Sequence, residues 1–82
     1  MTANMPVYTG MREFIWLWQL GVGAVAVRYS EISYMETVNS GATKVHLGLG
    51  YPIIVEQTQY QILCLIDAQQ RLNESLDKSA DA

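Results

Sequence analysis

The feature that most constrains this chain is a long apolar run that glycines interrupt. Aromatic and aliphatic residues dominate Phe14 to Leu20, Gly21-Val22-Gly23 breaks the run, and apolar residues resume from Ala24 to Tyr29. Two such segments joined by a short glycine turn are typical of a β-hairpin. Either two-residue turn, Gly21-Val22 or Val22-Gly23, preserves the same facing of the side chains. The sequence therefore predicts a first hairpin.

Both faces of this hairpin are expected to be largely apolar. One face would carry Phe14, Trp16 and Trp18 with Val25, Val27 and Tyr29, and the other Ile15, Leu17 and Gln19 with Ala24, Ala26 and Arg28. Strands that are apolar on both faces are normally covered on both. We therefore expect the core to cover one face, and another subunit or a partner protein to cover the other.

A second hairpin and a further strand are predicted to follow. The alternation shifts at Ser30-Glu31, which predicts a bend, and Asn39-Ser40-Gly41-Ala42 has the composition of a turn. Pairing across that turn would set Tyr34 beside Leu47 and Ile32 beside Leu49, with Met35 beside His46 and Thr37 beside Lys44 on the opposite face. After a turn near Gly50-Tyr51, an edge strand is expected to begin at Pro52, because proline cannot donate a ladder hydrogen bond.

The pattern changes to helical spacing at Thr58. Gln61 lies three residues later, which is the spacing of a capping box. A stripe that can lie on the sheet then recurs at Ile62, Leu65, Ile66, Gln69, Leu72 and Leu76. We predict a helix over 58–77 whose last turns project beyond the sheet.

These elements predict one α+β domain, since 82 residues leave no room for a second core. The expected fold is a small antiparallel β-sheet or partly open barrel of about four strands, followed by one C-terminal helix. An N-terminal arm over 1–12 would precede strands over 13–57. The helix over 58–77 would be followed by a frayed tail over 78–82, which lacks apolar anchors.

Composition favours a protein that assembles. Half of the residues are hydrophobic and only 16% are charged, which is more apolar side chain than so small a domain encloses. Part of it is expected at an interface with another copy or with another protein. The run from Phe14 to Val27 is too short for a bilayer, which needs about 20 apolar residues, and Gln19 interrupts it. Neither a signal peptide nor a membrane segment is predicted.

Charge and cysteine content narrow the partners further. The net charge is -3, and the basic residues are scattered, which argues against a nucleic-acid partner. A small anionic ligand stays open, because folding can gather two or three cations. Cys64 is the only cysteine, so no intrachain disulfide can form. This fits a cytoplasmic protein. If a phage encodes the chain, the expected location is the cytoplasm of the host cell.

No catalytic arrangement is recognisable in the sequence. His46 is the only histidine, and Cys64, between two leucines, is interpreted as a small buried apolar side chain. The carboxylates are dispersed, and the glycines lie in hairpins rather than before a helix, where a phosphate loop would need them. We therefore predict no catalytic residue, metal or cofactor, and a protein that is not an enzyme.

Part of the chain matches the order of elements of a known family. It reads Glu31-Ile32, then Glu36-Thr37, a turn, Thr43-Lys44-Val45-His46-Leu47, Gly50, Ile53, and Val55-Glu56-Gln57-Thr58 opening a helix with Ile62 and Ile66. The segment 31–66 resembles the small FlbD-like flagellar and swarming-motility proteins, which place a strand, a turn, a strand ending in glycine and a Val-Glu-rich strand before a final helix. The resemblance implies a motility factor without catalytic residues. The Trp-rich first hairpin departs from that pattern.

The aromatic group Phe14, Trp16 and Trp18 is the most informative candidate site. Two indoles on one strand provide a large apolar surface with N–H donors, which suits either the core and self-association or a functional binding surface. The candidate partner- or ligand-binding residues are Trp16, Trp18, Arg28, Tyr29 and Tyr51.

Our leading hypothesis is a non-enzymatic homo-oligomeric binding protein. It would be a small bacterial or phage-type regulator or inhibitor that acts through contacts with another protein. The alternative from another class is a protein that sequesters a small ligand, such as a nucleotide, between subunits. That alternative requires Arg28, Lys44 and tyrosines to converge on a pocket.

Overall fold

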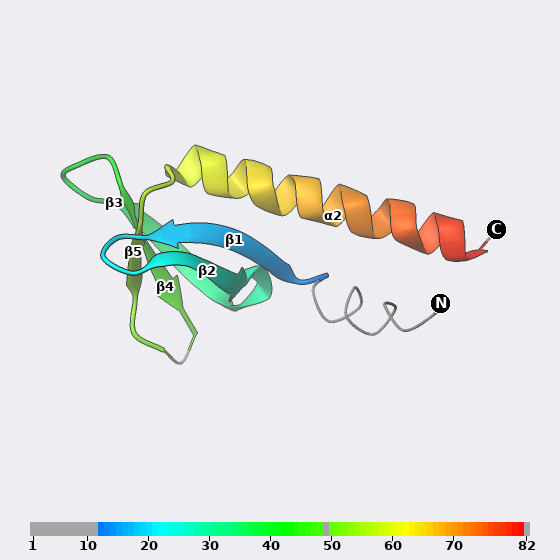
Figure 1. Ribbon diagram of the computed structural model, residues 1–82, viewed down its shortest axis with the longest axis horizontal. Coiled ribbons are helices and arrows are strands. Elements are labelled where there is room, and N and C mark those ends of the chain that lie inside the picture. Colours follow the sequence, from blue (N-terminus) through cyan, green and yellow to red (C-terminus); the bar gives the residue numbers. More distant parts are fainter. Residues whose placement is uncertain (1–11, 49, 82) are drawn as a thin grey trace.

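The computed structural model describes residues 12–48 and 50–81 and has the predicted order of strands followed by a helix (Figure 1). All but the last residue of the expected arm over 1–12 lies outside the described residues. The elements are β1 (Phe14–Gln19), β2 (Gly23–Arg28), the 3-10 turn η2 (Tyr29–Glu31), β3 (Ile32–Thr37), β4 (Thr43–Leu47), β5 (Ile53–Val55) and α2 (Gln59–Asp81). A five-stranded antiparallel open sheet followed by one C-terminal helix confirms the predicted α+β class.

The last strand lies in the middle of the sheet, whose order is β2-β1-β5-β4-β3. All three residues of β5 pair with β4, and Val55 also pairs with Gln19 of β1. The prediction of an edge strand was therefore wrong. Pro52 is tolerated because it lies just before β5 and need not donate to either neighbour.

The first hairpin has a three-residue loop instead of a two-residue turn. Gln19 pairs with Gly23, and Gly21 adopts a φ of 82°, which glycine reaches without steric cost. The longer loop shifts the pairing by one residue, and a shift of one residue turns every side chain of a strand to the other face. Phe14, Trp16 and Trp18 therefore share a face with Ala24, Ala26 and Arg28, whereas Ile15 and Leu17 share the core face with Val25 and Val27.

The second hairpin also differs from the predicted register by one residue. The expected bend at Ser30-Glu31 is confirmed as η2, but an irregularity between Ile32 and Tyr34 follows it. Tyr34 then pairs with His46, and Met35 pairs with Val45. Met35 packs against the core and Tyr34 is exposed, which reverses the predicted facing.

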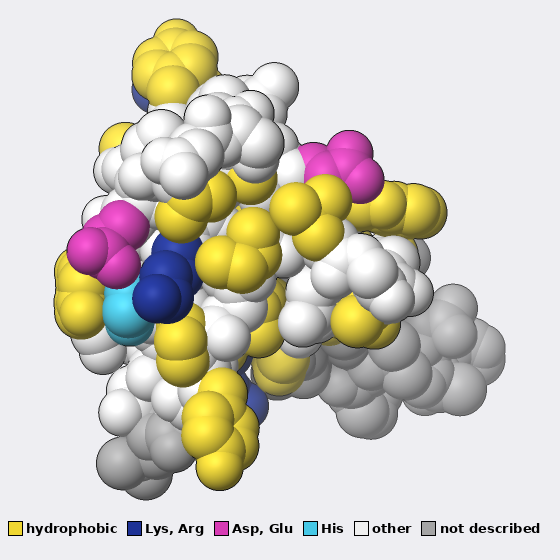
Figure 2. Space-filling view, turned by 90° about the vertical axis from the view of Figure 1, so that its left-hand side faces the viewer, with side chains coloured by type: hydrophobic (Ala, Val, Ile, Leu, Met, Phe, Trp, Pro, Cys, Tyr) yellow, Lys and Arg dark blue, Asp and Glu magenta, His cyan; other side chains and the backbone are white. Residues whose placement is uncertain are grey.

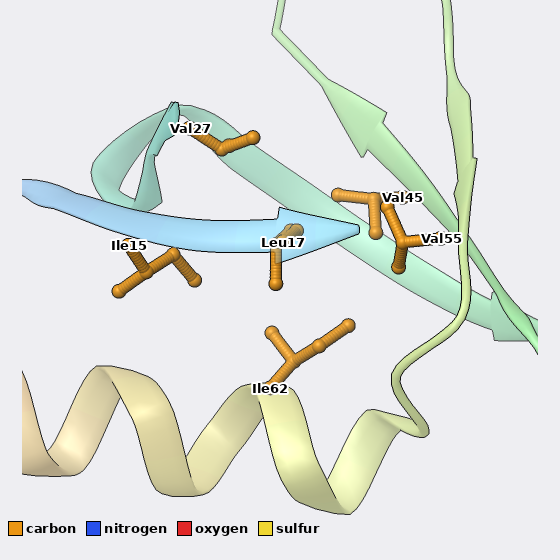
Figure 3. Close-up of a cluster of buried hydrophobic side chains, with 6 residues drawn as sticks. All are labelled: Ile15, Leu17, Val27, Val45, Val55 and Ile62. Carbon is orange, nitrogen blue, oxygen red and sulfur yellow. The ribbon is translucent and has the colours of Figure 1, made fainter. Parts of the chain in front are cut away.

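The core lies between the sheet and the first turns of the helix (Figure 3). Its buried apolar side chains are Ile15, Leu17, Val27, Val45, Val55 and Ile62. Ile62 of α2 points toward Leu17 of β1, so the helix closes the open side of the sheet. Each side chain of this kind contributes about 1.5–3 kcal/mol when it is fully buried.

The helix begins as predicted and ends later. The Thr58 Oγ1 accepts the Gln61 N–H at 3.1 Å, and the Gln61 Oε1 accepts the Thr58 N–H at 2.9 Å, which completes the capping box. The helix continues to Asp81, past the expected end at residue 77. Its second half extends beyond the sheet (Figure 1), and of the predicted stripe Leu65 and Leu72 are exposed.

Candidate protein-binding surface

The outward side of the first hairpin is an exposed apolar surface. We call this surface, made of Phe14, Trp16, Trp18, Ala24 and Ala26, the aromatic face. Trp16 is 58% exposed and Trp18 is 50% exposed. Each indole lies opposite an alanine, Trp16 beside Ala26 and Trp18 beside Ala24, so no large neighbour covers it across the strands. Contiguous exposed apolar side chains of this size typically mark an interaction site.

Strand alternation produces this surface from a single short segment. Ile15 and Leu17 point into the core and are almost completely buried, while the indoles between and after them point outward. The same strand thus anchors the domain and displays the indoles. Since β1 is held by the core, the aromatic face is presented on a rigid element.

Arg28 lies on the aromatic face, and the prediction that placed it opposite Ile15 on the other face was wrong. It pairs across the hairpin with Phe14, and its guanidinium carbon lies 5.1 Å from the centroid of the Phe14 ring. Its Nη1 is 2.9 Å from the Glu13 Oε1 and its Nε is 3.9 Å from the Glu31 Oε2. The charge of Arg28 is therefore already compensated by two carboxylates, and the side chain borders the apolar surface as a polar rim.

The two candidate tyrosines occupy different environments. Tyr29 lies in η2 and packs against the core, and its N–H donates to the Glu13 carbonyl at 2.9 Å, which gives it a structural role. Tyr51 is 91% exposed in the turn before β5. Of the five candidates, the structure gathers Trp16, Trp18 and Arg28 on one surface and places Tyr29 and Tyr51 apart from it.

A groove of about 240 Å³ opens next to the aromatic face, between β1 and α2. Its lining residues are Phe14, Ile15, Trp16, Leu65, Ala68, Gln69 and Leu72. The exposed leucines of the helix therefore form one wall of this groove, and Phe14 and Trp16 belong to both the groove and the aromatic face. The sequence did not predict the groove, because Leu65 and Leu72 were expected to lie on the sheet.

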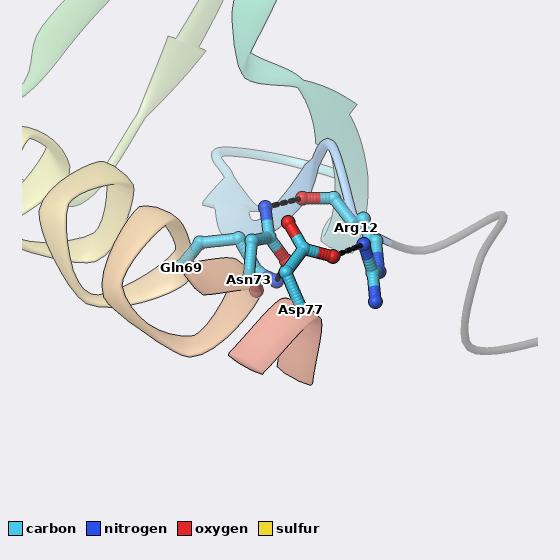
Figure 4. Close-up of polar contacts among 4 residues, drawn as sticks. All are labelled: Arg12, Gln69, Asn73 and Asp77. Carbon is cyan, nitrogen blue, oxygen red and sulfur yellow. Dashed lines mark hydrogen bonds and ion pairs between the residues drawn. The ribbon is translucent and has the colours of Figure 1, made fainter. Parts of the chain in front are cut away.

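Polar side chains fasten the far half of α2 at one end of this groove (Figure 4). The Asn73 Nδ2 donates to the Arg12 carbonyl at 2.8 Å and the Gln69 Nε2 donates to the Asn73 Oδ1 at 3.1 Å. The Arg12 Nη1 lies 2.6 Å from the Asp77 Oδ1. The only sequence signal for this cluster is the spacing of Gln69, Asn73 and Asp77 by four along the helix. Arg12, which Asn73 and Asp77 contact, lies far away in the sequence, just before β1.

The outer face of β3 and β4 carries a separate polar cluster. The rings of Tyr34 and His46 stack with centroids 3.9 Å apart, and the His46 Nε2 lies 2.8 Å from the Glu36 Oε1. Glu36 also pairs across the strands with Lys44, and Figure 2 shows the single histidine, in cyan, next to basic and acidic side chains. Because β1 and β5 separate β2 from β4, Lys44 and Arg28 do not converge within one chain.

The helix exposes its cysteine, contrary to the expectation of a buried one. A hydrogen bond and a charge interaction with Cys64 raise the pKa of the Tyr60 phenol, one turn away on the same side of α2. In residues 12–48 and 50–81, no three side chains of the ligand-forming types gather into a metal site. No helix in this part of the chain is both long enough and apolar enough to cross a membrane.

Comparison of the chain with protein-family models, with curated proteins and with solved structures gave no match. The functional assignment therefore depends on the surfaces described above.

Proposed function

We propose that this protein is a non-enzymatic binding protein that acts through protein contacts made by the aromatic face. The observation that carries the proposal is the half exposure of Trp16 and Trp18 on a strand whose alternate residues Ile15 and Leu17 are buried. Trp, Tyr and Arg dominate the binding energy of protein interfaces, and their contribution is largest where a polar rim surrounds them. Arg28, with Glu13 and Glu31, supplies such a rim at one end of the face.

The same surface supports assembly with a second copy. Large indoles and small alanines alternate across the two strands, so a second aromatic face could place its indoles over the alanines of the first. One aromatic side chain buries about 150–250 Å². Two half-exposed indoles therefore provide together roughly 200 Å² of surface for a contact. A stable interface needs about 800 Å² from each partner. The oligomer or complex would therefore also use the exposed Leu20 and Val22 of the hairpin loop, or the groove beside β1.

We assign the protein to the small regulators or inhibitors of bacterial or phage type, which act by occupying the surface of another protein. A FlbD-like motility factor would depend on the segment from β3 to α2 and would leave the exposed indoles without a role. A small-ligand protein would need cations that are free to bind an anion, whereas Arg28 is engaged by two carboxylates. The exposed aromatic face thus favours protein contacts over both alternatives.

Native mass spectrometry of the tagged protein, taken directly from the cells that produce it, tests the proposal. We expect more than one subunit or a retained protein partner. Trp18→Lys is expected to release the second subunit or the protein partner, because a charge would be buried in the contact. Tyr51→Lys, at an exposed position on another turn, is the matched control and should retain it. A monomer without any partner would contradict the proposal, and a retained nucleotide mass would favour the small-ligand alternative.

A further inference from the structure

We infer that the partner adds an extended strand to the open edge of β1 at Phe14 and Trp16, with side chains in the groove beside α2. This inference rests on the proposed function and specifies the kind of partner: a short, extended, apolar segment of another polypeptide. Main-chain hydrogen bonds and side-chain pockets together define this mode of recognition.

The alternation of peptide groups along β1 determines which residues face the open edge. In an antiparallel sheet, successive residues direct their N–H and C=O groups to opposite sides. The Leu20 N–H donates to the Ile54 carbonyl at 2.9 Å and the Trp18 carbonyl accepts the Glu56 N–H at 2.8 Å, so these residues face β5. Phe14 and Trp16, in the same alternation, direct their peptide groups to the same edge.

This edge is occupied at both ends and open between them. At one end the Trp18 N–H donates to the Gln57 Oε1 at 3.0 Å, and at the other the Arg12 carbonyl accepts from the Asn73 side chain. β5 pairs with β1 only at Gln19, so it stops short of the intervening residues. Within the described residues, the peptide groups of Phe14 and Trp16 have no hydrogen-bond partner at this edge. Unpaired groups on a strand edge are a template for an added strand.

The walls of the groove specify the side chains of the added segment. An added strand would alternate its side chains between the two sides of the sheet. One set would enter the groove against Leu65 and Leu72, and the other set would extend the aromatic face next to Trp16. Among the described residues that line the groove, Gln69 is the only polar one, and its side-chain amide already donates to Asn73. The segment is therefore apolar on both sides over the two or three residues that pair.

Spacing argues against β1 of a second copy as the occupant. Paired strands lie about 4.8 Å apart, whereas packed helices need about 8–10 Å between their axes. The helix α2 runs along this edge of β1, where Asn73 reaches the Arg12 carbonyl. Pairing two β1 edges would bring two such helices closer than they can pack. A segment without a helix attached fits the opening.

A short synthetic peptide of alternating valine and leucine, with a lysine at each end and blocked termini, is a suitable probe. Isotope-labelled protein titrated with this probe should show slower hydrogen exchange at the Phe14 and Trp16 amides. Exchange in β3 should not change. The same peptide methylated on alternate backbone nitrogens is the control, because it keeps the side chains and loses donors to the edge. Protection of β2 or β3 instead, or no protection up to the solubility limit of the probe, would overturn the inference.

Two substitutions test the contributions of the strand edge and of the groove separately, and a third is a control. Trp16→Pro removes an N–H that points to the open edge and not to β2, and proline is tolerated on such an edge. We expect at least a tenfold loss of affinity for the probe, because about one hydrogen bond accounts for that factor and the variant also loses the indole that lines the groove. Ala68→Trp fills the groove from an exposed helix position and should abolish binding, whereas Gln70→Trp, on the opposite side of the helix, should not. Unchanged binding by Ala68→Trp would contradict a site in the groove.

These outcomes are distinguishable from failure of the proposed function. If Trp18→Lys releases a partner but the probe protects neither amide, the protein-binding function stands and the strand site fails. If the probe protects both amides but the protein from cells is a bare monomer, the strand site stands and the proposed function fails.

Discussion

Asn73 donates its side-chain amide to the backbone carbonyl of Arg12, 61 positions earlier in the sequence, at 2.8 Å. This hydrogen bond joins the part of α2 that extends beyond the sheet to the start of β1. It also closes one end of the open edge at Phe14 and Trp16. This one contact thus helps to fasten the far part of the helix and also closes one end of the open edge.

Asn73→Ala should loosen the far half of α2. We expect the free energy of unfolding to fall by about 1–2 kcal/mol, since a partly buried hydrogen bond is lost and the Arg12 carbonyl is left without its donor. Hydrogen exchange in the last turns of α2 should become faster, while exchange near the capping box stays unchanged. Glu74→Ala, at the exposed neighbouring position, is the control and should change stability by less than about 0.5 kcal/mol. Equal effects of the two substitutions would contradict the role of Asn73.

Adjacent residues of β1 should respond oppositely to truncation. Leu17→Ala should cost about 2–5 kcal/mol, because Leu17 is 1% exposed and its removal leaves a cavity beside Ile62. Trp18→Ala should leave the unfolding midpoint in urea nearly unchanged, because its indole is half exposed. Loss of folding in Trp18→Ala would mean that the indole belongs to the core and not to a binding surface.

The loop of the second hairpin depends on the left-handed backbone of Gly41. Its φ is 86°, and its N–H donates to the Val38 carbonyl at 2.9 Å. Gly41→Ala should lower the free energy of unfolding by about 1–2 kcal/mol, which is the cost of a Cβ in this conformation. Gly48→Ala is the matched control, since an added Cβ meets only the Glu31 carbonyl oxygen at 3.8 Å. Urea unfolding of both variants tests the difference.

The Tyr60 phenol should titrate above its ordinary pKa of 10.0, because Cys64 hydrogen-bonds to it and repels its charge. Absorbance of the phenolate during alkaline titration measures this shift, and Cys64→Ala should bring the pKa back toward the ordinary value. The folded state holds this proton more tightly than the unfolded chain. Its contribution to stability is therefore present below pH 10.0 and is lost as the pH rises through the raised pKa. An unchanged pKa in Cys64→Ala would rule out the interaction.

Local chemistry was sufficient to predict the elements of this fold. The alternation of apolar residues predicted strands, glycines predicted the turns, and Thr58 with Gln61 predicted the start of the helix. Each of these features depends on residues only a few positions apart. Trp16 and Trp18 were also named as candidate binding residues, but the sequence left open whether their face belongs to the core or to a binding surface.

The register and the place of β5 could not be predicted in this way. Gly21 and Gly23 allow loops of two or three residues, and the two choices turn opposite sides of β2 to the core. Pro52 favoured an edge strand, but the three residues of β5 fit between β1 and β4 without using its nitrogen. Local sequence does not discriminate between these arrangements.

The sequence by itself determined which segments are strands, where they turn and where the helix begins, because those properties depend on short-range spacing and backbone preference. Only the tertiary structure decided which face of the first hairpin is buried, because Ile15 and Leu17 pack on Ile62 from the distant helix. It also decided that β5 ends at Val55, so that within the described residues the peptide groups of Phe14 and Trp16 have no partner at the open edge of β1. Packing between segments far apart in the sequence determines the buried face and the strand order. The buried face and the strand order in turn create the surfaces to which we assign binding.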